Sequence, residues 1–345
     1  MPAVRRGVGA TNAQLGVILL AVALAALPAM LLTGRLSNRA APHLVWLTLA
    51  IFGVAGVLPA FASSRWLLFV FLLLAGAGSG ALDVAINARA NSLETVRSIR
   101  VMDGMHALYS AGVVVGGVGT GLLRRAGAHP SAILAGVCAV VLLVAAANAR
   151  AEALPVTPVR QTALVGPLLV VGAVFAVSAL LESGVEAWSA LLLESGLHSS
   201  PAVSGLGPGL FAAGMVTGRG LAQRLAPTST ASRMAVSGAA AGIGLGLSAA
   251  TTQPAVAVAG IFIAGCGLAL SVPTLFRLAG RLGAAPAIST VAVVGYVGFL
   301  VGPPVIGGVA GATSLRGGFV FLAGVGALLV ASVPILGRLR RESPA

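Results

Sequence analysis

The sequence predicts an all-α protein that crosses a lipid bilayer many times. Of its 345 residues, 58% are hydrophobic and only 8% are charged, and the mean hydropathy is +1.03. Soluble domains contain about 25% charged residues, and no soluble fold of this size can enclose so much apolar surface. The apolar runs are continuous and have the length of a spanning helix, about 20 residues, whereas the strands of a membrane barrel alternate apolar and polar positions.

Along the chain we expect eleven transmembrane helices. They cover residues 15–32, 44–62, 66–87, 105–123, 132–146, 164–193, 203–218, 234–250, 255–276, 287–309 and 317–336. Two glycine-rich runs, residues 76–80 and 116–121, lie inside these segments. Neither follows a strand or contains a phosphate-binding lysine, so both favour close packing of helices over nucleotide binding.

The arginines predict the orientation of the chain. The net charge is +13 and all 21 basic residues are arginine. Threading the eleven helices through a bilayer places 15 arginines on one side and 6 on the other, so the positive-inside rule predicts a cytoplasmic C-terminus. Because these arginines lie between apolar runs rather than in one stripe, they argue against a nucleic-acid-binding protein. The smaller set is Arg5, Arg6, Arg65, Arg124, Arg125 and Arg316.

Two Gly-Arg loops reveal an internal repeat. The first contains Gly34, Arg35 and Arg39, and the second contains Gly218, Arg219 and Arg224. Their offset, 218 − 34 = 184 residues, is about half of the chain, as in transporters built from two related halves. The second half has six helices and the first has five. We therefore expect that one preceding helix is missing and that the intact form has twelve; a true eleven-helix protein is the alternative.

The repeat also predicts the domain organisation. Residues 1–148 form an N-terminal bundle and residues 164–345 form a C-terminal bundle. Residues 149–163 between them are polar and contain prolines, which is typical of a linker.

The Gly-Arg loops resemble the cytoplasmic signature of the major facilitator superfamily, and this resemblance implies that Gly34, Arg35, Arg39, Gly218, Arg219 and Arg224 belong to cytoplasmic gating loops. Further motifs resemble a bacterial branch related to fucose permease. They are Asp83-Val84-Ala85-Ile86-Asn87, His106-Ala107-Leu108-Tyr109-Ser110, Glu182 with Trp188-Ser189, and Gly295-Tyr296 with Gly302-Pro303-Pro304. The resemblance implies a major facilitator fold in which residues 1–148 hold helices 2–6 and residues 164–345 hold helices 7–12. It departs at Asn38 and Gln223, where the family loop has aspartate, and at Ser183 and Ala187 in the seventh helix.

Acidic residues inside the apolar segments are the candidate coupling groups, since an ionisable group in lipid costs at least ~2.5–3.5 kcal/mol and usually faces a cavity or a partner. Asp83 and Asn87 are four residues apart and share a helix face, as do Glu182 and Glu186. The resemblance implies that the acid at position 83 takes part in proton coupling. Each acid could instead serve a structural role, Asp83 by pairing with Arg89.

Five further side chains complete the predicted proton-coupling and substrate cavity. They are His106, Tyr109, Trp188, Ser189 and Tyr296. His106 could equally hydrogen-bond a neighbouring helix. We expect Glu194, at the end of the helix that contains Glu182, to be a solvated loop residue.

The predicted function is secondary active transport of a small solute across the bacterial cytoplasmic membrane by alternating access, coupled to protons. Three Trp and two Tyr offer few platforms for a sugar, so a drug or amphiphile exporter is an alternative, as is a non-transporting regulatory or truncated protein. A serine protease built on Ser79 and His106 leaves the repeat unexplained. We expect a monomer whose partners are the lipid bilayer, the solute and protons, with no enzymatic activity, nucleic acid, cofactor or metal.

Overall fold

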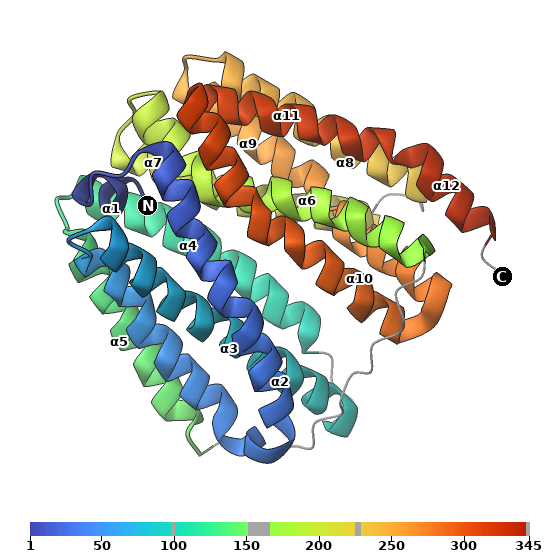
Figure 1. The fold of residues 1–345 in the computed structure, drawn as a ribbon, viewed down its shortest axis with the longest axis horizontal. Helices are drawn as coiled ribbons and strands as arrows, with labels where there is room; N and C mark the ends of the chain where they lie inside the picture. The colour runs from blue at the N-terminus through green and yellow to red at the C-terminus, as the bar shows by residue number, and fades with distance from the viewer. Residues whose placement is uncertain (98–100, 151–165, 225–228, 343–345) are drawn as a thin grey trace. The chain divides into compact units, whose positions relative to one another are not determined.

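The computed structural model describes residues 1–97, 101–150, 166–224 and 229–342. Over these ranges the chain is almost wholly helical and contains no strand (Figure 1). Its elements are α1 (Pro2–Gly7), α2 (Asn12–Val57), the 3₁₀ turn η1 (Leu58–Phe61), α3 (Arg65–Arg97), α4 (Met102–Arg125), α5 (Pro130–Asn148), α6 (Gly166–Leu191), the π-helical turn η2 (Leu192–Gly196), α7 (Pro201–Arg224), α8 (Thr230–Ala250), α9 (Pro254–Leu268), α10 (Ser271–Ala312), α11 (Leu315–Ala331) and α12 (Val333–Glu342).

The predicted all-α membrane class is confirmed. Eight segments of the described chain are long and apolar enough to cross a membrane: Asn12–Leu36, His43–Phe61, Arg65–Glu94, Pro130–Asn148, Gly166–Gly196, Pro254–Leu282, Val291–Ala312 and Leu315–Leu339. The other three predicted spans coincide with α4, α7 and α8. These helices are rich in glycine and serine, which lowers their hydropathy and favours close packing. The total of eleven spans stays a prediction.

The connections between some spans are helical, whereas the hydropathy pattern predicts breaks between the helices there. Residues 33–43 lie within α2 and residues 277–286 within α10, and the ribbon of α2 turns back on itself between its two spans (Figure 1). Arg, Leu and Ala, which are strong helix formers, make up much of both connections. The predicted linker, residues 149–163, lies almost wholly outside the described residues.

The chain begins with a short helix that leads into a capped start of α2. α1 has Pro2 in its first turn, where the missing N–H is no loss, and Gly9 follows it at φ +60°. Thr11 then begins α2 with a capping box. Its hydroxyl accepts from the Gln14 N–H at 3.2 Å, and the Gln14 side chain accepts from the Thr11 N–H at 3.0 Å.

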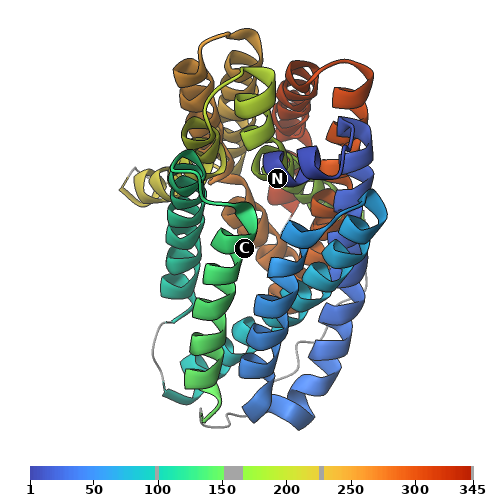
Figure 2. The ribbon, with the colours of Figure 1, turned by 90° about the vertical axis from the view of Figure 1, so that its left-hand side faces the viewer.

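The chain divides into two compact units. The first comprises Met1–Tyr109 and Ala126–Pro158. In it, α3 and α5 both pack against α2, and Figures 1 and 2 show the three ribbons side by side. A Cβ placed on Gly76 would lie 2.1 Å from the Val22 carbonyl oxygen, and one on Gly80 would lie 2.5 Å from that of Ala26. The prediction that this glycine run serves helix packing is therefore confirmed.

The second unit comprises Ser110–Arg125 and Val159–Ala345. In it, α6 packs along α10, while α8 contacts α9 and α11 and α7 contacts α9. The hydroxyl groups of Ser178 and Ser271 lie 2.5 Å apart and join α6 to α10. The C-terminal half of α4 belongs to this unit, so that α4 contributes to both. The predicted bundle boundaries, 1–148 and 164–345, stay a prediction.

Candidate functional site

The predicted gating loops are segments of helix in the structure. Gly34 and Arg35 lie in α2, and Gly218, Arg219 and Arg224 end α7. Arg39 also lies in α2, but its side chain is outside the described part. The expected loop conformation differs because a Gly-Arg pair does not by itself end a helix; a helix ends where its backbone groups find other partners. The gating role of these residues stays a prediction.

Asp83 and Asn87 lie on one face of α3, as their spacing predicts. The Asn87 amide donates to the Asp83 carbonyl oxygen at 2.8 Å and to its carboxyl Oδ1 at 3.1 Å. Asp83 is exposed and Asn87 is half-buried. The amide therefore holds the Asp83 carboxyl in place while leaving it accessible.

His106 and Tyr109 both lie in α4, three residues apart. The Tyr109 side chain is 66% exposed, whereas the His106 side chain is outside the described part. Their predicted role in a cavity stays a prediction.

Glu182 and Glu186 are half-buried on one face of α6. Glu186 experiences the repulsion of Glu182, and Glu182 experiences the attraction of Arg219 on α7. A predicted coupling acid thus lies within electrostatic range of a predicted gating arginine on another helix. This proximity could not be predicted from the sequence, because Glu182 and Arg219 lie on different helices.

Trp188 and Ser189 belong to the packing of the second unit. Trp188 has no exposed surface and donates its indole N–H to the Pro303 carbonyl at 3.2 Å. The Ser189 hydroxyl is fully buried and makes no hydrogen bond within the described structure; it lies beneath Gly207 of α7, where a Cβ would meet it at 2.9 Å. Tyr296, on α10, is half-buried and lies at a ring distance of 6.0 Å from Phe299.

Glu194 is a buried ion-pair partner, and the prediction of a solvated loop residue was wrong. It lies in η2, and its two carboxyl oxygens accept from both terminal nitrogens of Arg124 at 2.8 and 2.9 Å. The Ser204 hydroxyl donates a third bond at 2.8 Å. The exposed fractions of the Arg124 and Glu194 side chains are 13% and 6%. Glu194 lies in the span Gly166–Gly196, and a charged side chain buried in such a segment is usually paired with an opposite charge.

Glycines next to this ion pair let α4 and α7 approach closely. A Cβ on Gly205 would lie 2.4 Å from the Gly117 carbonyl oxygen, and one on Gly121 would lie 2.8 Å from that of Pro201. Gly117 and Gly121 are four residues apart, as are Gly205 and Gly209, the spacing of small residues that join membrane helices. The predicted packing role of the 116–121 run is confirmed.

Among the described residues, no group of three His, Cys, Asp or Glu side chains lies close enough to hold a metal ion. Cys138 and Cys266 are both free thiols on different helices.

Known proteins are similar to this chain in sequence and in fold. Residues 1–287 match the Major Facilitator Superfamily. The chain is 29% identical over 353 residues to an uncharacterized MFS-type transporter of Yersinia pestis, covering 98% of this chain and 89% of that protein. Its fold is similar to that of a bacterial homologue of the human lysosomal transporter Spinster, with a TM-score of 0.77, 15% identity, and coverage of 100% and 93% of the two chains. It is also similar to the nucleoside transporter NupG, with a TM-score of 0.69, 15% identity, and coverage of 95% and 91%. The helical spans and the match over most of the sequence lead to one conclusion: this chain belongs to the Major Facilitator Superfamily of membrane transporters.

Proposed function

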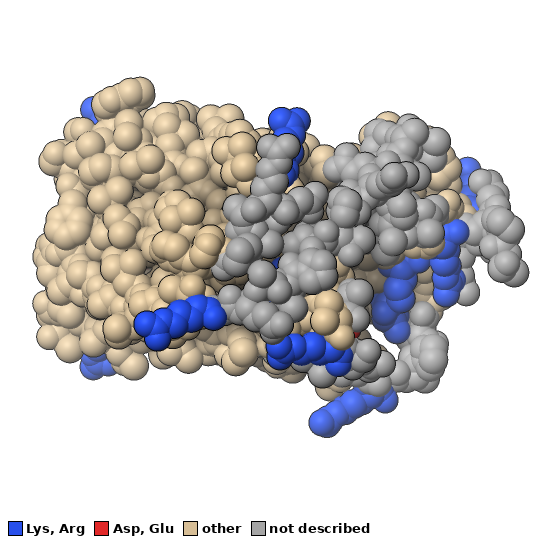
Figure 3. Space-filling model, turned by 90° about the horizontal axis from the view of Figure 1, so that it is seen from below, with Lys and Arg blue, Asp and Glu red and all other residues tan. Residues whose placement is uncertain are grey.

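We propose that the protein is a proton-coupled secondary transporter of a bacterial cytoplasmic membrane, which moves a small solute by alternating access. It works as a monomer with its C-terminus in the cytoplasm. Family membership supports a membrane transporter, and the face drawn in Figure 3 contains a broad area without charged side chains, which suits contact with lipid. The proton coupling is argued from the residues of α6.

The observation that supports the proposal is that Glu182 shares a face of α6 with a second acid and experiences the charge of an arginine on α7. Glu186 lies one turn away on α6, and Arg219 of α7 attracts Glu182. Desolvation and a neighbouring like charge both disfavour a second negative charge on such a pair. One proton can therefore be shared between the two carboxyls and exchanged with water when the site opens.

Protonation of this pair would also change the contact between two helices. A proton on Glu182 removes the negative charge that attracts Arg219, and so weakens the interaction between α6 and α7. A ligand shifts a conformational equilibrium only by its different affinity for the two states. If α6 and α7 separate during the cycle, Arg219 attracts the ionised Glu182 in only one of the two states. The affinity of Glu182 for a proton then differs between these states.

Asp83 on α3 is the second proposed coupling group. It is accessible, and Asn87 holds its carboxyl in a fixed orientation. The resemblance to the fucose permease branch supports this role. Two acids on different helices would let proton binding depend on the conformation of the whole chain.

Membership of the family supports transport but does not identify the class of solute, since one fold serves many functions. The fucose permease resemblance supports a sugar. An exporter of amphiphilic solutes is the second candidate, because the sequence contains only three Trp and two Tyr and the Trp188 indole is already bonded to Pro303. Fucose and the lipophilic cation ethidium are therefore suitable probes for the two classes.

Proteoliposomes that contain a trapped pH-sensitive dye test this proposal. We expect fucose or ethidium to drive proton movement with the wild-type protein, and we expect Glu182→Gln to abolish it because glutamine carries no exchangeable proton. Solute exchange at equal concentration and pH needs no net proton transfer, so it should persist and serves as the control for folding. The same assay applies to Asp83→Asn. Wild-type proton movement in Glu182→Gln would remove this carboxyl from the coupling mechanism.

A further inference from the structure

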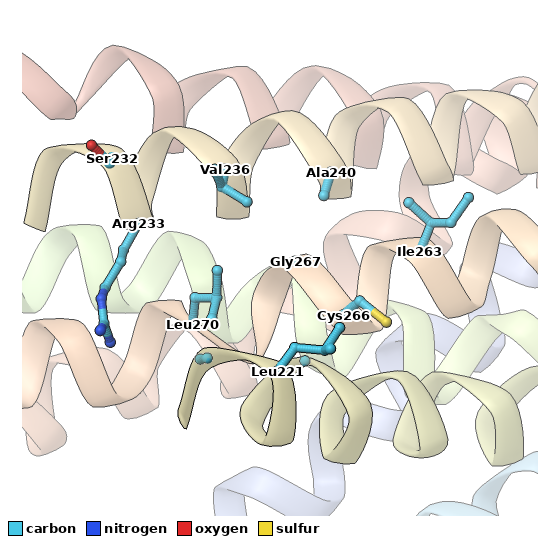
Figure 4. A pocket seen from close by; sticks show the side chains of 11 residues that line it. Leu221, Ser232, Arg233, Val236, Ala240, Ile263, Cys266, Gly267 and Leu270 are labelled. Carbon is cyan, nitrogen blue, oxygen red and sulfur yellow. The ribbon is translucent and has the colours of Figure 1, made fainter. Parts of the chain in front are cut away.

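The second unit contains a groove whose lining includes no acidic residue. Its volume is about 320 Å³, and α7, α8, α9 and the residue before α10 line it. Leu221, Val236, Ile263 and Leu270 contribute most of its apolar wall. Figure 4 shows these side chains between the helices, with Arg233 at one end and Ile263 at the other.

The apolar length of the groove suits part of an acyl chain. Arg233 and Ala240 both line it and are seven residues apart on α8, which corresponds to about 10 Å along a helix. Val236 and Leu221 are 53% and 52% exposed. In a protein that spans a membrane, an open apolar groove of this kind suits a lipid tail better than water.

The charge at one end of the groove selects a head group. Arg277 of α10 lies close enough to Arg233 for their positive charges to act on one another, and the charge of Arg281 acts on Arg277. Between Glu194 and Glu342 the sequence contains nine arginines and no acidic residue. The groove therefore has one positively charged end, because Arg233 lines it and the charge of Arg277 acts there as well.

We propose that the groove is a binding site for an anionic phospholipid, whose phosphate binds at Arg233 while an acyl chain lies against Val236 and Leu270. Basic pockets between transmembrane helices bind anionic head groups, and the negative surface of the cytoplasmic leaflet concentrates such lipids. An acyl chain gains little by leaving other lipid tails, which are as apolar as leucine. The head group must therefore decide which lipid is retained. The proposal needs only the membrane location and not the transport activity.

Native mass spectrometry of the purified protein tests this site with phosphatidylglycerol and phosphatidylcholine as probes. We expect the wild type to bind one phosphatidylglycerol more tightly than phosphatidylcholine. Arg233→Gln should weaken phosphatidylglycerol binding about fivefold, the equivalent of the ~1 kcal/mol that one arginine contributes near a membrane surface, and should weaken phosphatidylcholine binding less, because the choline cation already compensates the phosphate of that lipid. Arg338→Gln, an exposed arginine on α12 that does not line the groove, is the matched control and should behave as the wild type.

Two further measurements separate a lipid site from a simple phosphate site. Val236→Trp should block the groove and lower phosphatidylglycerol binding with Arg233 intact, and soluble glycerol phosphate should fail to compete. Wild-type phosphatidylglycerol affinity in both Arg233→Gln and Val236→Trp would overturn the proposal. Competition by glycerol phosphate would overturn the acyl-chain part of the site, and equal losses in Arg233→Gln and Arg338→Gln would reduce it to a general attraction of the basic surface.

Discussion

Arg124 and Glu194 illustrate how a membrane protein accommodates two opposite charges away from water. Desolvation of each charge costs several kcal/mol, which only good geometry and additional hydrogen bonds can offset. Here two parallel N–H···O bonds join the side chains, and the Ser204 hydroxyl fills a third acceptor position. Such bidentate bonds between ions are roughly twice as strong as neutral ones. The pair therefore fixes the end of α4 against η2.

Removal of one member of the Arg124–Glu194 pair should destabilise the protein, because the other charge then stays buried without a partner. We expect Glu194→Ala to lower the free energy of unfolding by about 3 kcal/mol, because the guanidinium of Arg124 then stays buried without its counter-charge. Chemical unfolding of the detergent-solubilised protein measures this loss. Arg125→Gln is the control, since Arg125 is the exposed neighbour, and should change the value by no more than about 0.5 kcal/mol.

A double-mutant cycle distinguishes the ion pair from two independent effects. Arg124→Gln combined with Glu194→Gln should lose less stability than the sum of the single variants, with a coupling energy of about 0.5–3 kcal/mol. Strict additivity would show that the two side chains contribute separately.

At the residue scale, sequence reasoning found acids that share one helix and missed partners on different helices. The spacing of Asp83 and Asn87 predicted their common face, and their hydrogen bonds agree with it. Glu194 was misjudged because its partner lies 70 residues away, and no local pattern indicates such a contact. One signal was available: Arg124 is an arginine at the end of an apolar run on the side that receives few arginines.

At the scale of elements, α4 and α7 pack closely because the residues at their contact are glycines, which have no side chain. Lipid tails are as apolar as leucine, so helices in a bilayer gain stability from close packing rather than from escaping water. Glycine spacing predicted that residues 116–121 would pack closely, but it could not identify α7 as the partner helix. It also could not predict that α2 and α10 continue through their connections, because helix ends depend on capping partners rather than on hydropathy.

A methyl group at the contact should separate these two helices. In Gly205→Ala the new Cβ would lie 2.4 Å from the Gly117 carbonyl oxygen and 3.0 Å from the Gly121 Cα. Both are backbone atoms that cannot rotate away, so we expect a loss of about 1–3 kcal/mol, as in other overpacked sites. Thermal unfolding in detergent checks this expectation.

Gly220→Ala provides the matched control on the same helix. Nothing lies within 4 Å of a Cβ at Gly220, and alanine is the better helix former by about 1 kcal/mol. This variant should be as stable as the wild type or slightly more so. Equal destabilisation of the two variants would mean that the α4–α7 contact is not what Gly205 provides.

At the scale of the whole molecule, composition predicted the class and the arginines predict the orientation. Each span needs only its own hydropathy to be recognised, which is why α2, α3, α5 and α6 were found with soft boundaries. α4, α7 and α8 were also found as helices, although glycine and serine lower their hydropathy. How the two units sit against each other depends on long-range contacts that no such pattern records.

The orientation can be tested by fusing reporters to the chain. Alkaline phosphatase is active only outside the cytoplasm, whereas a fluorescent protein exported in unfolded form stays dark. The last described span, Leu315–Leu339, has Arg316 at one end, and Arg338, Arg340 and Arg341 lie at the other. Because basic residues near the ends of a span hold their side in the cytoplasm, we expect fluorescence from a fusion after Ala345. Phosphatase activity should appear from an insertion at Thr313, in the connection between α10 and α11. The opposite pair of signals would invert the predicted topology and place the arginine-rich end of the lipid groove in the outer leaflet.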